Sequence, residues 1–261
     1  MYSGVGFGIA LAGLYCVGAS TVGQHAAAMW VQLGVIATLL AVPVAFVLKG
    51  GAPAPVPTRA PVRATHQEGG ITGLVACYGA LGFGYILPAT FLPVLAHSIV
   101  DDPRIFGLAW PVFGITAAAS TLIAGWALRH FTRLQVWAVS NVVMGVGVLL
   151  PSLWLNGVTV ALSALCVGGT FMIVTLAGVQ EVRARAHGDA TPLVARMTAA
   201  FAIGQIAGPI ASSLLLHVPQ FRDNGLNIAL QAAALSVFAA AVVLWRIDRA
   251  AHEHTEVSHA R

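Results

Sequence analysis

Residues 71–96 read ITGLVACYGALGFGYILPATFLPVLA, a run of 26 residues without any aspartate, glutamate, lysine, arginine or histidine. A helix rises about 1.5 Å per residue, so this run would form a helix of about 39 Å, longer than the roughly 30 Å hydrocarbon core of a bilayer. Apolar and polar residues do not alternate along it, as they would in a strand of a membrane barrel. The stretch therefore predicts a membrane-spanning helix.

Seven further stretches share this freedom from ionisable side chains. They are residues 4–20, 27–48, 105–128, 134–151, 157–180, 197–216 and 225–245. Every charged residue and every histidine lies outside the eight stretches, because a charge at mid-bilayer costs at least about 2.5–3.5 kcal/mol. The 261 residues are 58% hydrophobic and only 8% charged, which excludes an ordinary water-soluble domain. We predict an all-α integral membrane protein with eight transmembrane helices.

The lysines and arginines predict the orientation, because short cytoplasmic loops are enriched in them. Alternate connections between spans lie on the same side of the membrane. Eleven basic residues lie in one set of connections, at 49–70, 129–133, 181–196 and 246–261: Lys49, Arg59, Arg63, Arg129, Arg133, Arg183, Arg185, Arg196, Arg246, Arg249 and Arg261. Only Arg104 and Arg222 lie in the other set, at 21–26, 97–104, 152–156 and 217–224. We therefore expect a multi-pass membrane protein with both termini in the cytoplasm. The net charge of +4 is small and its basic residues are dispersed, so no nucleic-acid partner is expected.

Prolines mark the boundary between two groups of helices. The longest polar connection, 49–70, carries Pro53, Pro55, Pro57 and Pro61, which favour an extended connector and oppose a helix. We predict four parts along the chain. They are a two-helix unit at 1–48, a Pro-rich cytoplasmic linker at 49–70, a six-helix bundle at 71–246 and a cytoplasmic tail at 247–261.

Three local sequences carry a family resemblance. They are GFGYILPATFLP at 82–93, RMTAAF at 196–201 followed by GQIAGP at 204–209, and GVGFGIA at 4–10. They resemble the YbfB/YjiJ family of bacterial major facilitator superfamily transporters, and this resemblance implies a place in the bacterial inner (plasma) membrane. The resemblance implies that the eight helices correspond to helices 5–12 of that twelve-helix fold, so that the chain lacks the first four.

That resemblance implies secondary active transport of a small organic solute by alternating access, with the chain either a truncated form of the transporter or a natural product as it stands. A second copy or another protein would then be a possible source of the missing helices. The alternative is a non-transporting remnant or a membrane interaction subunit. The expected partners are the lipid bilayer and an unknown small-molecule substrate.

Polar side chains inside the spans are candidates for a substrate cavity, because a hydroxyl or amide in a bilayer needs a partner. These are Tyr78, Tyr85, Thr170, Thr175, Asn141 and Gln205. Tyr78 and Tyr85 are seven residues apart and therefore share one helical face. The resemblance assigns their helix, and that of the two threonines, to the four that line the central cavity. The structural alternative is hydrogen bonding between helices, worth about 0.6 kcal/mol per bond.

Other residues are candidates for bending helices and for closing a cytoplasmic gate. Prolines inside spans remove backbone hydrogen bonds and bend helices, and the candidates are Pro88, Pro93 and Pro209. Candidates for a cytoplasmic gate are Arg129, Arg133, Glu181, Arg185 and Arg196. Gly125 and Arg133 match the superfamily's loop signature, whereas Arg129 replaces its acidic residue, and Glu181 and Arg185 could pair with Arg196. The alternative for Arg129 and Arg133 is the positive-inside rule alone, and for Glu181, Arg185 and Arg196 it is ordinary solvated surface pairing.

Motifs for catalysis are missing from the sequence. It contains no H-E-x-x-H, no G-x-S-G nucleophile turn and no G-x-x-x-x-G-K-[ST] phosphate loop. Its three cysteines are odd in number and lie within spans, which predicts neither disulfides nor a zinc site. We therefore expect no enzymatic activity, no cofactor and no metal site.

Overall fold

The computed structural model describes residues 3–48, 68–99, 107–186, 188–221 and 224–259, and in these ranges the chain is almost entirely helical. The helices are α1 (Ser3–Thr21), α2 (Ala26–Leu48), α3 (Glu68–His97), α5 (Ala109–His130), α6 (Arg133–Leu153), α7 (Gly157–Arg185), α8 (Thr191–His217) and α9 (Gly225–His259), with a short 3₁₀ turn, η1 (Pro219–Phe221). The eight α-helices are all long and apolar enough to cross a membrane. The predicted all-α fold with eight spans is confirmed.

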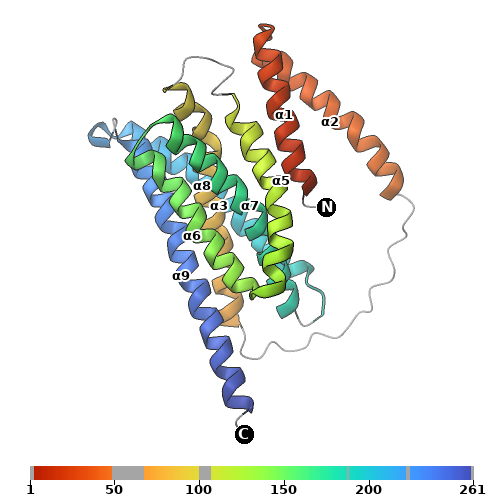
Figure 1. Cartoon of the computed structure of the whole chain (residues 1–261), viewed down its shortest axis with the longest axis vertical. Helices are drawn as coiled ribbons and strands as arrows, with labels where there is room; N and C mark the ends of the chain where they lie inside the picture. The colour runs from red at the N-terminus through yellow and green to blue at the C-terminus, as the bar shows by residue number, and fades with distance from the viewer. Residues whose placement is uncertain (1–2, 49–67, 100–106, 187, 222–223, 260–261) are drawn as a thin grey trace.

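Six helices, α3 and α5 to α9, form one bundle (Figure 1). In this bundle α3 packs against α8 and α9, α6 packs between α7 and α9, and α5 packs against α7. Large apolar side chains fill the centre, among them Leu74, Leu81, Trp137 and Met144, which are fully buried. The interior is therefore a packed core, and the side chains discussed below are held by neighbours from several helices.

Glycines let pairs of helices meet backbone to backbone. A Cβ atom built on Gly82 of α3 would lie 2.2 Å from the Phe201 carbonyl oxygen of α8, and one on Gly204 would lie 2.2 Å from the Gly79 oxygen. On α1, a Cβ at Gly6 would lie 2.6 Å from the Gly114 oxygen of α5. Only glycine fits at such positions, and close approach through small residues is a common way for membrane helices to associate.

The first two helices differ in how they pack. Helix α1 lies along α5, whereas α2 extends away from the rest of the chain (Figure 1) and its membrane-length window has no buried residue. Among the described residues, the hydrogen bond from the Tyr15 hydroxyl to Gln32 joins α1 to α2. Residues 49–67 of the predicted linker lie outside the described residues, and 68–70 begin α3. The four-part division therefore remains a prediction.

Candidate functional site

An aromatic cluster occupies the place where α3, α5, α7 and α8 come together. We define the cluster as Tyr78, Tyr85, Phe113, Phe171 and Phe201. The Tyr85 ring stacks on Phe171, with centroids 4.2 Å apart and planes 16° apart. Phe113 and Phe201 lie 6.0 Å and 6.2 Å from the same ring. Tyr85 is thus the centre of the cluster, because it contacts one ring from each of the three neighbouring helices.

The two tyrosines of α3 share one face, as their spacing predicts. Tyr78 meets Phe201 at 5.5 Å and Trp137 of α6 edge-on at 5.9 Å, so it joins the cluster to the core. The Tyr85 side chain is also buried, yet none of the hydrogen bonds among the described residues involves its hydroxyl. A buried tyrosine usually gives its O–H a partner, so this group is available to a polar atom of a ligand.

The two threonines of α7 bond within their own helix. Thr170 donates to the Cys166 carbonyl oxygen at 2.7 Å, and Thr175 donates to the Phe171 oxygen at 2.9 Å. These bonds satisfy the hydroxyl protons without a second helix and leave oxygen lone pairs as acceptors. The structural alternative of hydrogen bonds between helices is therefore not what these two hydroxyls form.

The two amides predicted as candidates lie in different surroundings. Asn141 is fully buried in α6, and neither its Nδ2 nor its Oδ1 atom has a hydrogen-bond partner in the described part of the chain. The indole nitrogen of Trp137, one turn earlier on α6, is likewise buried and without a partner. Gln205 is half-buried on α8. Each amide lies one turn from a ring at the cluster, Asn141 after Trp137 and Gln205 after Phe201, and their role in a substrate cavity stays a prediction.

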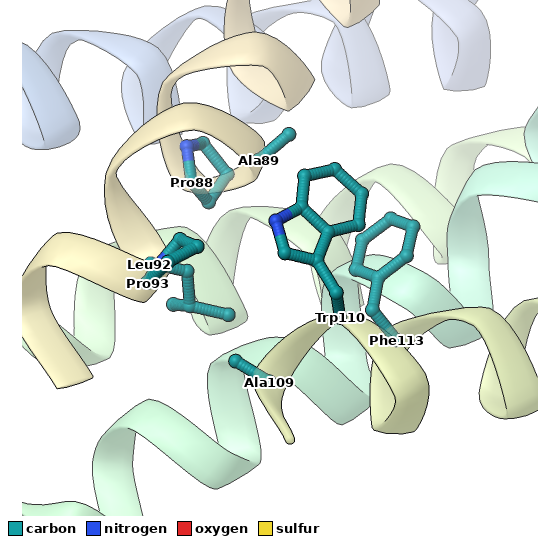
Figure 2. A pocket seen from close by; sticks show the side chains of 7 residues that line it. All are labelled: Pro88, Ala89, Leu92, Pro93, Ala109, Trp110 and Phe113. Atoms are coloured by element: carbon teal, nitrogen blue, oxygen red, sulfur yellow. The ribbon is translucent and has the colours of Figure 1, made fainter. Parts of the chain in front are cut away.

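Two of the predicted helix-bend residues face α5. Pro88 and Pro93 of α3 line a small pocket, with a volume of about 10 Å³, against Trp110 and Phe113. Figure 2 shows these two aromatic rings side by side on α5, facing the part of α3 that carries the prolines. Helices α3 and α8 both continue without a break through Pro88, Pro93 and Pro209. The prolines thus lie within continuous helices, next to aromatic rings in the case of α3.

Charged residues meet at the end of the bundle where α6 begins and α7 ends. Glu181 accepts from Arg133 Nε at 2.9 Å through Oε2 and from Arg185 Nε at 2.6 Å through Oε1. The Glu181 side chain is only 10% exposed, so this carboxylate is largely removed from water. Of the predicted gate residues the structure brings together these three. Arg129 and Arg196 are exposed, and neither is in an ion pair within the described ranges.

Asp248 of α9 was not among the predicted site residues. Its buried carboxylate accepts from the Thr132 hydroxyl at 2.8 Å and from Gln135 Nε2 at 2.9 Å. Thr132 and Gln135 also form the capping box that begins α6. The sequence marks Asp248 only as an acidic residue between Arg246 and Arg249, and gives no sign that the start of α6 packs against it. The side chains of Glu181 and Asp248 thus connect the first turn of α6 to α7 and to α9, respectively, through hydrogen bonds.

These features define a multi-pass α-helical membrane protein. Its helices meet through glycines, surround an aromatic cluster and are joined by polar contacts at one end. A family model described as "Uncharacterised MFS-type transporter YbfB" matches residues 1–244, and the chain belongs to this family of major facilitator superfamily transporters. The predicted resemblance is confirmed. Searches of curated proteins and of solved structures found no match.

Proposed function

We propose that this chain is a secondary active transporter that moves a small organic solute across the bacterial inner membrane by alternating access. The observation that carries the proposal is the aromatic cluster centred on Tyr85, whose hydroxyl has no hydrogen-bond partner among the described residues. Small-molecule sites combine apolar and aromatic walls with a few placed polar groups, and the cluster has this composition. Tyr85 is the residue that we assign to the substrate, and Thr170 offers an acceptor oxygen one residue before Phe171.

The polar contacts at the ends of α6, α7 and α9 fit the role of a cytoplasmic gate. Arg133 and Asp248 lie in connections or helix ends that the loop charges assign to the cytoplasm. Since Glu181 binds arginines of both α6 and α7, these helix ends would move together when one side of the protein opens. Arg129 and Arg196, exposed at the same side, would then remain free to meet groups that approach during closing.

The proposed orientation predicts the result of a reporter experiment. A phosphatase active only outside the cytoplasm should be active when fused after His25, in the turn between α1 and α2. It should be inactive when fused after Ala60, and a cytoplasmic fluorescent reporter should show the opposite pattern. The reason is the eleven-to-two distribution of lysine and arginine between the two sets of loops. The reverse result at both positions would overturn the orientation.

Transport itself is tested with Tyr85 variants. Purified protein in proteoliposomes should take up at least one solute from a panel of labelled neutral and charged organic compounds. Tyr85→Ala removes both the ring stacking and the hydroxyl, and should reduce that uptake at least tenfold, since misplaced or lost site contacts commonly cost about that much or more. Tyr85→Phe keeps the ring, so any loss it shows belongs to the hydroxyl.

The matched control is Leu122→Ala on α5, whose side chain is 79% exposed and lies away from the cluster. Uptake by Leu122→Ala should equal that of the wild type, and the three variants should reach the membrane in equal amounts. If the wild type takes up none of the panel, the alternative of a non-transporting remnant or interaction subunit is favoured. If Tyr85→Ala transports like the wild type, the assignment of Tyr85 to the substrate fails.

A further inference from the structure

A second cavity, of about 490 Å³, is lined by α1, the start of α2, the end of α3 and the start of α5. Its volume falls in the range of about 300–1,000 Å³ that is usual for small-molecule sites. The lining side chains used in the argument below are Ala12, Cys16, Val17, Ser20 and Trp110. Pro93 and Trp110 also line the small pocket of Figure 2, so the two spaces are neighbours.

Backbone contacts hold this cavity open on its α5 side. A Cβ on Gly13 of α1 would lie 2.7 Å from Pro111 Cδ, so α1 and α5 already touch there and cannot come closer. Earlier on α1, the buried Gly6 and Ala10 lie on the same face as Gly13. Because α1 is fixed against α5 at Gly13, collapse of the cavity would require the two helices to separate or bend. The cavity therefore persists while this contact lasts.

Water is a poor occupant of this cavity. The Ser20 hydroxyl, its main polar group, already donates to the Val17 carbonyl oxygen at 2.8 Å. Cys16 contributes only a weakly polar thiol, and none of the lining residues is charged. A buried water needs about two to four hydrogen-bonding partners, which this lining does not provide. An empty space is also unfavourable, because its walls lose dispersion contacts on one side. The chemistry of the lining thus calls for an apolar occupant.

We infer that this cavity binds one acyl chain of a membrane phospholipid. Most of its lining residues, including Val17 and Trp110, are half-buried, so the cavity is open to the surroundings of the helices. Because α1, α3 and α5 are each long and apolar enough to span a membrane, the acyl chains of the bilayer would reach this opening. The lining has no charged group to hold a headgroup, so the chain enters and the headgroup stays at the membrane surface. With the proposed topology, the lipid comes from the outer leaflet. This inference does not depend on transport.

Native mass spectrometry of the detergent-solubilised protein tests it. The wild type should retain one phospholipid after extensive detergent washing. Ala12→Phe combined with Val17→Phe fills the cavity, and should lower the retained fraction at least tenfold. The control combines Leu11→Phe with Leu14→Phe, two exposed positions of the same helix, and should retain lipid like the wild type. Equal retention in both double variants, no retained lipid in the wild type, or a retained molecule other than a phospholipid would overturn the inference.

A second measurement uses only the wild type, so it does not depend on how the filled variant folds. The protein is placed in nanodiscs with a phospholipid that carries a photoreactive diazirine near the end of one acyl chain. Peptide mapping after illumination should find adducts on Cys16, Val17 and Trp110 at several times the level found on Leu11 and Leu14. Even labelling of lining and exposed positions would show an ordinary lipid-facing surface, and would overturn the proposed site.

Discussion

Gly204→Ala is expected to destabilise the protein by about 2–3 kcal/mol, at the upper end of the usual cost of overpacking a core. The added methyl group would lie 2.2 Å from the Gly79 oxygen and 2.7 Å from Phe83 N, both of them backbone atoms of α3. No rotamer change can relieve such contacts, so α3 and α8 must separate. In detergent, the midpoint of thermal unfolding should fall by about 5–10 °C.

The matched control adds the same methyl group where the structure has room. A Cβ on Gly8 of α1 meets no atom within 4 Å, and alanine favours a helix by about 1 kcal/mol over glycine. Gly8→Ala should therefore leave the midpoint unchanged or raise it slightly. Equal midpoints for Gly204→Ala and Gly8→Ala would contradict the backbone contact between α3 and α8.

Glu181→Gln is the second substitution with a large expected effect. It leaves Arg133 and Arg185 close together without the carboxylate that both bind. Removing one partner of a fully buried pair costs about 3–5 kcal/mol, but the two arginine side chains are 43% and 22% exposed, so water screens part of the loss. We expect a loss of about 2 kcal/mol of unfolding free energy, measured as a lower thermal midpoint in detergent.

Two further variants make this measurement specific. Adding Arg133→Gln to Glu181→Gln removes one of the facing cations and should recover part of the lost stability. Asp189→Asn changes an exposed carboxylate before α8, whose pKa is lowered by hydrogen bonds from the Thr191 side chain and backbone amide, and should have little effect. If Glu181→Gln and Asp189→Asn have the same midpoint, the contacts of Glu181 do not stabilise the bundle.

The number of spans was predictable because the membrane separates charged from apolar residues along the chain. The helix ends were less predictable. The charge-free stretch 157–180 gives the start of α7 correctly, yet the helix continues to Arg185. Likewise α8 begins at Thr191, six residues before its charge-free stretch. A charge-free window reports the hydrocarbon layer, whereas a helix continues into the interface as long as its backbone bonds and end contacts allow.

The candidate site was predictable only where the signal is local. The shared face of Tyr78 and Tyr85 follows from helical spacing, and so does the closeness of Glu181 and Arg185. The partners of Glu181 and Asp248 on α6 do not follow, since Arg133 is 48 residues from Glu181 and Gln135 is 113 from Asp248. Such pairs depend on which apolar helices lie side by side, and apolar helices are too alike in sequence to show it.

The glycine contacts of α3 with α8, and of α1 with α5, also affect how these helices can move. Where side chains interdigitate, one helix cannot shift along its neighbour unless rotamers change. At Gly82 and Gly204, and at Gly6 and Gly114, backbone lies against backbone with no side chain interlocked between. The glycines that hold these helices so close therefore put no side chain in the way of axial sliding at these points, and along α3 and α8 the rings of Tyr78 and Tyr85 against Phe201 are what resists it.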